Sequence, residues 1–136
     1  MPVWMKTTLR LVALAFVLFM AFIIYRADTG TMPGIIRTIY AFPNGDRVGH
    51  FVLYAVFTLL VNASMLRIIK IGKANLMLGS LIIAAFGTLE EFSQLFFAAH
   101  RTFDLIDLSC TLLGVMLADV TVRILKPDSG SSSVVK

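Results

Sequence analysis

The chain has 136 residues, of which 58% are hydrophobic and 15% charged, and its mean hydropathy is +0.88. This composition is too apolar for a soluble domain and indicates a protein whose solvent is lipid. The net charge of +4 does not indicate a nucleic-acid partner, because the basic residues are dispersed at the ends of apolar runs and form no stripe. Attraction to anionic lipids accounts for them instead.

Four apolar runs follow one another, and each is long enough to cross a bilayer core of about 30 Å as a helix. They cover residues 8–25, 48–66, 75–98 and 105–125. The predicted fold class is therefore all-α, an integral membrane bundle of four transmembrane helices that forms a single domain over residues 1–126. The polar residues 127–136 predict a disordered C-terminal tail.

The first run follows the basic residues Lys6 and Arg10, as the apolar part of a secretory signal peptide would. Signal peptidase requires a small residue three places before the cut, and Tyr25 occupies that place in Tyr25-Arg26-Ala27. We therefore expect a retained membrane anchor.

Most Lys and Arg residues fall on the side of the predicted bundle that holds the N-terminus. The positive-inside rule then predicts that both termini of this multi-pass membrane protein are cytoplasmic. The outer loop from Arg26 to Arg47 contains apolar residues that predict a face lying along the membrane surface. The basic residues assigned to the inner side are Lys6, Arg10, Arg67, Lys70, Lys73, Arg123, Lys126 and Lys136.

The acidic residues are concentrated on the opposite side. A carboxylate at membrane depth costs about 2.5–3.5 kcal/mol on insertion scales, so it normally faces protein or water and marks a site. Asp119 and Asp128 fall toward the inner side. The acids that map to the outer half or the outer loops are Asp28, Asp46, Glu90, Glu91, Asp104 and Asp107.

In each of the last three runs, small and polar residues recur every three or four positions, which places them on one helix face. Such faces permit close packing and hydrogen bonds between helices. The polar end of each run lies on the outer side, so the three faces predict a polar pocket that opens outward. The faces comprise Asp46, His50, Tyr54, Thr58 and Asn62; Ser80, Ala84, Gly87, Glu91, Gln94 and Ala98, with Glu90 at the edge; and Asp104, Asp107, Thr111, Gly114, Ala118 and Thr121.

Several of these residues stand in the order and at the spacing of a known family. The motifs are Asp46-Arg47-x-x-His50 with Tyr54, Glu91-x-x-Gln94, and Arg101-x-x-Asp104-x-x-Asp107 with Gly114. Over residues 46–118 the chain resembles the VanZ-like family, small bacterial membrane proteins named for a glycopeptide-resistance accessory protein. The resemblance implies a cell-envelope protein of the bacterial cytoplasmic membrane and reduced susceptibility to teicoplanin-type antibiotics, without implying a reaction.

The chain departs from the family pattern at three places. Thr111 stands where that family usually has Asn or Asp, Ala99-His100 replaces a common Pro-Gly, and Ala118 replaces a late glycine. A role that needs a carbonyl or carboxylate at position 111 therefore does not transfer to this chain.

The first functional hypothesis is an intramembrane site for the headgroup of an envelope lipid or lipid-linked precursor, because the planar guanidinium group of arginine suits phosphate and carboxylate. Whether the protein is an enzyme stays open; if it is, His50 or Glu91 would act as general base. The catalytic candidates are Glu91, His50 and Asp107. The ligand-binding candidates are Asp46, Arg47, Tyr54, Glu90, Gln94, Arg101 and Asp104.

Three alternatives stay open. Glu91, Asp107 and His50 offer ligand types that divalent cations accept, but no HExxH motif, cysteine pair or EF-hand loop supports them, so we predict no metal and no cofactor. A non-enzymatic scaffold would use the polar residues only to lock the helices together. Ion translocation would need polar residues that continue to the inner side, where the sequence offers few.

Overall fold

The structure is a computed structural model that describes residues 2–96 and 102–125. The described chain is mostly helical, and three helices are long and apolar enough to cross a membrane: α1 (Val3–Asp28), α3 (Gly45–Met65) and α5 (Leu105–Leu125). The short helix α2 (Gly34–Tyr40) lies between α1 and α3, and α4 (Leu78–Ser93) precedes α5. The predicted tail, residues 127–136, and the candidate residue Arg101 lie outside the described residues.

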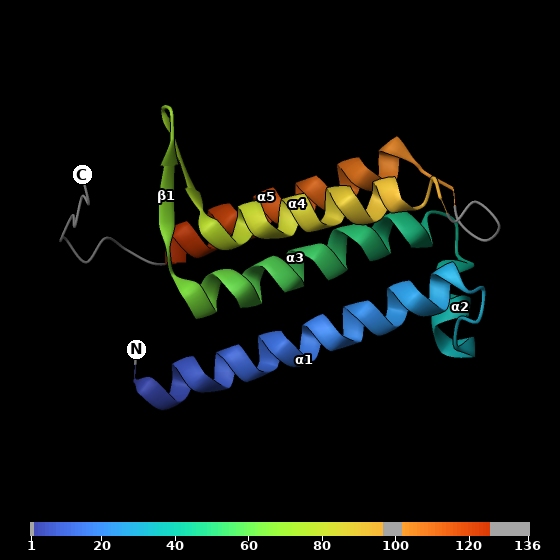
Figure 1. The fold of residues 1–136 in the computed structure, drawn as a ribbon, viewed down its shortest axis with the longest axis horizontal. Coiled ribbons are helices and arrows are strands. Elements are labelled where there is room, and N and C mark those ends of the chain that lie inside the picture. Colours follow the sequence, from blue (N-terminus) through green and yellow to red (C-terminus); the bar gives the residue numbers. More distant parts are fainter. Residues whose placement is uncertain (1, 97–101, 126–136) are drawn as a thin grey trace.

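The long helices run beside one another and define two ends of the bundle (Figure 1). At one end, which we call the cavity end, α1 and α4 finish, α3 and α5 begin, and α2 packs nearby. At the other, the hairpin end, α1 begins and α3 is followed by a β-hairpin. The predicted polar ends of α3, α4 and α5 therefore lie at the same end of the molecule.

Helices α3 and α5 form the most extensive contact in the bundle. The contact is close because Gly114 has no side chain: a Cβ at this position would collide with the backbone carbonyl oxygen of Phe51. Beside it, an apolar core joins α1, α3, α4 and α5 through Met20, Tyr54, Phe57, Ile83 and Val115.

The outside of the bundle is covered by large apolar side chains. More than half of the surface of Leu14, Leu18, Leu113, Met116 and Leu117 is exposed. Soluble proteins rarely expose so many neighbouring apolar side chains, whereas the lipid-facing surface of a membrane helix consists of them. The surface therefore agrees with the membrane class that the composition predicts.

The prediction of an entirely helical chain is wrong between α3 and α4. Strand β1 (Ile68–Ile71) pairs antiparallel with β2 (Ala74–Met77), so the predicted helical run 75–98 begins in a strand. The β-branched isoleucines of β1 favour a strand, and Gly72 takes the positive φ of 59° that a tight hairpin turn needs. Helix α4 consequently has only 16 residues.

A buried polar network fixes the hairpin end. The Asp119 carboxylate accepts hydrogen bonds from the Met77 N–H (2.8 Å) and the Ser80 hydroxyl (2.7 Å). Asn62 Nδ2 donates to the same Ser80 hydroxyl oxygen at 2.7 Å, and Arg123 Nε lies 2.6 Å from Asp119 Oδ2. This network joins α3, β2, α4 and α5. Asp119, which the sequence predicts to lie toward the inner side, therefore has a structural role.

Candidate functional site

The cavity end contains a group of buried polar side chains. Burying such groups costs free energy unless they find hydrogen-bond partners. They come from α3, α4, the turn after α4, and α5. We call this group the polar cluster; its members are His50, Tyr54, Glu90, Glu91, Gln94, Asp107 and Thr111, each less than a tenth exposed, together with the half-exposed Asp46.

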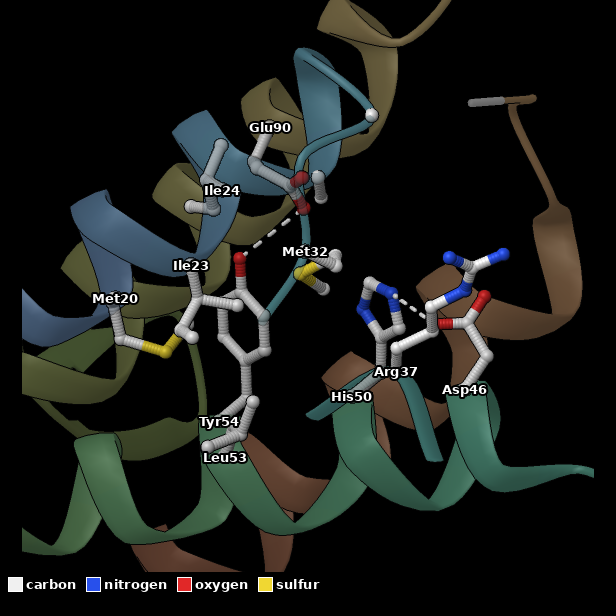
Figure 2. A pocket seen from close by; sticks show the side chains of 12 residues that line it. Met20, Ile23, Ile24, Met32, Arg37, Asp46, His50, Leu53, Tyr54 and Glu90 are labelled. Carbon is white, nitrogen blue, oxygen red and sulfur yellow. Dashed lines mark hydrogen bonds and ion pairs between the residues drawn. The ribbon is translucent and has the colours of Figure 1, made fainter. Parts of the chain in front are cut away.

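An amphipathic cavity of about 370 Å³ opens beside the polar cluster (Figure 2). One wall is apolar and comes mainly from Met20, Ile23 and Ile24 of α1, with Leu53 of α3. The polar wall is formed by Arg37, Asp46, His50, Tyr54 and Glu90. The cavity therefore presents aliphatic and ionisable groups to the same occupant.

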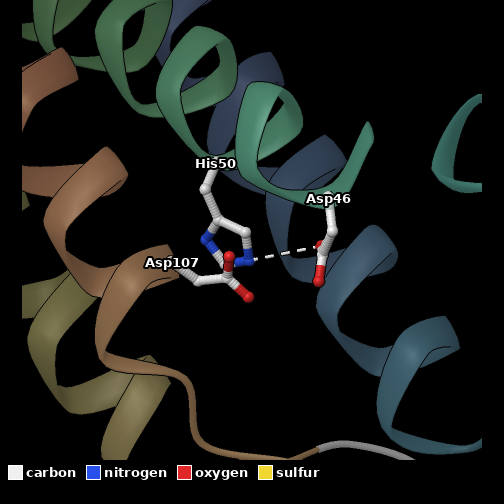
Figure 3. Close-up of side chains that lie close together, drawn as sticks. All are labelled: Asp46, His50 and Asp107. Carbon is white, nitrogen blue, oxygen red and sulfur yellow. Dashed lines mark ion pairs between the residues drawn. The ribbon is translucent and has the colours of Figure 1, made fainter. Parts of the chain in front are cut away.

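His50 is held between α3 and α5. Its Nδ1 lies 3.2 Å from the Thr111 hydroxyl oxygen, and its Nε2 lies 3.6 Å from Asp46 Oδ1, one turn earlier on α3. Asp107 approaches from α5, and one ligand atom from each of Asp46, His50 and Asp107 lies within 4.8 Å of the other two. Figure 3 shows the three side chains pointing toward one another.

The two glutamates at the end of α4 have different partners, although both are buried. Glu90 lines the cavity and accepts a long hydrogen bond of 3.4 Å from the Tyr54 hydroxyl. Glu91 Oε1 accepts the backbone N–H of Asp104 at 3.0 Å and thereby ties the end of α4 to the start of α5. Gln94 Nε2 donates to both carboxylates, at 3.3 Å to Glu90 and 3.1 Å to Glu91.

Arg47 and Asp104 lie at the rim of the cluster. The Arg47 guanidinium donates to Asn44 Oδ1 at 2.8 Å, and its distances to Asp104 and Asp107 are 3.8 Å and 4.0 Å. Asp104 Oδ1 accepts the Ile106 N–H at 2.7 Å, so this carboxylate caps α5. Asp104 therefore has a structural role as a helix cap, while a binding role there stays a prediction.

The structure brings together nine of the ten predicted site residues, and the tenth, Arg101, lies outside the described part of the chain. The sequence prediction did not include α1 or the segment that follows it. Met20, Ile23, Ile24 and Arg37 line the cavity, and Ile23 follows Met20 by the three residues that place both on one face of a helix. That spacing is a signal, but in a uniformly apolar helix it does not distinguish a cavity-facing side from a lipid-facing one.

The sequence prediction also did not reveal the role of Thr111. It is 1% exposed and holds His50, and a Cβ on Gly87 would collide with the Thr111 methyl group and the Tyr54 ring. Gly87 thus leaves the space in which these two side chains reach the cluster.

In comparisons with known proteins, no protein-family model, curated protein or solved structure matches the chain.

Proposed function

We propose that this chain is a VanZ-like integral membrane protein of the cell envelope, whose cavity binds the headgroup of an envelope lipid or lipid-linked precursor. The main support for this proposal is the amphipathic cavity. Its polar wall offers Arg37 to a phosphate or carboxylate and the Glu90 and Asp46 carboxylates to hydroxyl or amine groups. Its apolar wall from α1 supplies the surface that the first part of an acyl chain would cover.

The proposed topology has four transmembrane crossings, with both termini on the cytoplasmic side of the bacterial inner membrane. Helix α4 has 16 residues, which corresponds to about 24 Å of helix. This length is short for a bilayer core of about 30 Å, but local thinning and the adjoining residues make up differences of this size. The positions of Lys and Arg support this orientation, and the cavity then opens toward the outer leaflet.

Lipid retention tests the proposal. Protein purified in mild detergent should carry bound lipid that native mass spectrometry detects. Replacing Ala27, which lines the cavity, by Trp should remove at least nine tenths of this lipid because the indole occupies the binding space. Ala21→Trp is the matched control, since Ala21 lies on the exposed face of the same helix. Equal retention by the two variants would contradict binding in the cavity.

The resemblance to the VanZ-like family adds a cellular expectation. Cells that express the chain should tolerate a glycopeptide antibiotic better than cells without it, and Glu91→Gln at equal membrane abundance should reduce that tolerance. Glu91→Gln keeps the side-chain shape and removes a charge that holds α5 at Asp104. A phenotype that follows membrane abundance alone would support the scaffold alternative, which the many hydrogen bonds inside the polar cluster favour.

A further inference from the structure

We propose that Asp46, His50 and Asp107 form a binding site for a divalent transition-metal cation such as Zn²⁺ or Mn²⁺. Two carboxylates and one imidazole are a ligand set that such cations accept, and three protein ligands leave coordination positions free for another molecule. The sequence shows that these residue types are present, but it does not show that they lie close together, because Asp107 comes from a different helix.

The distances fit a metal site. Metal–ligand bonds near 2.1 Å in tetrahedral geometry place the ligand atoms about 3.4 Å apart. His50 Nε2 and Asp46 Oδ1 are 3.6 Å apart, and all three ligand atoms lie within 4.8 Å of one another. Small side-chain rotations are therefore enough to bring the three atoms around one cation.

His50 is oriented for this role by its second nitrogen. A proton on Nδ1 can be donated to the Thr111 hydroxyl oxygen, 3.2 Å away, and Nε2 then carries the lone pair that a metal needs. Nε2 is also the nitrogen that faces Asp46. Thr111 is thus a positioning residue in α5 that fixes the tautomer and the ring.

Asp107 provides an independent observation. Its side chain is more than nine tenths buried and points toward His50 and Asp46 (Figure 3). Among the described residues, Asp107 Oδ1 accepts no hydrogen bond, and its ion pair with Arg47 Nε is long, at 4.0 Å. A buried carboxylate oxygen without a donor is costly, and a cation bound at this position would satisfy it.

The other acidic group around His50 is less suited to a cation. One ligand atom from each of His50, Glu90 and Glu91 also lies within 4.8 Å of the other two. However, Glu91 already accepts the Asp104 N–H, and both glutamates accept from Gln94. We therefore assign the site to the two aspartates, which have fewer hydrogen-bond partners among the described residues.

Two of the three proposed ligands, Asp46 and His50, also line the cavity. A cation at this position would direct a free coordination position toward the occupant of the cavity, where a phosphate oxygen can bind. This link between cation and headgroup rests on the proposed function, whereas the cation site itself does not.

The direct test is calorimetric titration of Zn²⁺ and Mn²⁺ into the full-length, chelator-treated protein in nanodiscs of zwitterionic lipid. One equivalent should bind, and Asp107→Asn and His50→Ala should each weaken binding at least tenfold. Thr111→Val should weaken cation binding by about tenfold, because loss of a group that orients a metal ligand typically lowers metal affinity by about 10- to 100-fold. Absence of saturable binding to the wild type, or wild-type affinity in Asp107→Asn, would overturn the proposal.

A matched control separates ligation from folding. Asp119 lies on the same helix about 18 Å away and is equally buried, but it belongs to the network at the hairpin end. Asp119→Asn should lower thermal stability and keep cation affinity within twofold. Cation-free Asp107→Asn should be at least as stable as the cation-free wild type, because it removes a buried negative charge that lies beside the Asp46 carboxylate. Affinity that falls with stability in both variants would overturn the proposal.

A second titration distinguishes this inference from the proposed function. A short-chain phosphatidic acid should bind at least tenfold more tightly to the cation-loaded protein than to the chelated protein. Equal affinity in the two states would overturn the link between cation and headgroup. Failure of the lipid to bind in either state would overturn the proposed function, while the first titration still decides the cation site.

Discussion

Replacing Asp119 by Ala should destabilise the protein strongly without weakening any ligand bound at the cavity end. The carboxylate accepts hydrogen bonds from the Met77 N–H and the Ser80 hydroxyl and pairs with Arg123 at 2.6 Å. Asp119 is 3% exposed, so its removal leaves three buried or half-buried donors without their acceptor. Breaking a buried charged pair typically costs about 3–5 kcal/mol, and we expect a loss of this size in the free energy of unfolding.

Equilibrium unfolding in mixed micelles with increasing SDS would measure this loss. Thr121→Val is the control, because within the described part of the chain the Thr121 hydroxyl donates only to the Leu117 carbonyl of its own helix. Its replacement should change the unfolding free energy by less than about 0.5 kcal/mol. A loss below about 1 kcal/mol for Asp119→Ala would refute the structural role that we assign to this carboxylate.

Two further predictions concern packing and topology. Gly114→Val should destabilise the bundle by about 1–3 kcal/mol, because the new side chain collides with the backbone of α3, whereas Gly34→Ala, with open space around it, should have little effect in the same unfolding assay. In a Cys110→Ala background, a membrane-impermeant thiol reagent applied to intact cells should label Thr102→Cys and not Lys73→Cys, since the proposed topology places the two ends of α4 on opposite sides. Equal labelling of the two cysteines would contradict a membrane crossing by α4.

The sequence predicted the buried faces of the helices well. Small and polar residues at intervals of three and four placed Tyr54, Thr58 and Asn62 on one side of α3, and all three are at most 2% exposed. The reason is physical for Tyr54 and Asn62: in a lipid environment, their hydroxyl and amide groups gain hydrogen bonds by facing Glu90 and Ser80 of α4. Threonines do not follow this reason, because the hydroxyls of Thr58 and Thr121 both bond to a carbonyl one turn earlier in their own helix; Thr58 is nevertheless fully buried.

The sequence did not reveal the hairpin or the contribution of α1. Hydropathy treats Ile68, Ile69 and Ile71 as apolar residues near a membrane helix and does not register that β-branched side chains next to Gly72 favour a hairpin. The role of α1 depends on which side of an apolar helix faces the bundle, and its residues vary too little in polarity to show this. The proximity of Asp107 to His50 arises from the packing of α5 against α3, which no local pattern specifies.

The most direct test of the proposed headgroup site is cross-linking with a phospholipid that carries a photoactivatable group near the start of an acyl chain. After irradiation in membranes, peptide mapping should place the label on Met20, Ile24 or Leu53, which line the cavity. The label at these positions should disappear in Ala27→Trp and persist in Ala21→Trp. Labelling confined to Leu14 and Leu18, on the exposed face of α1, would show that lipid only surrounds the protein and would contradict the account.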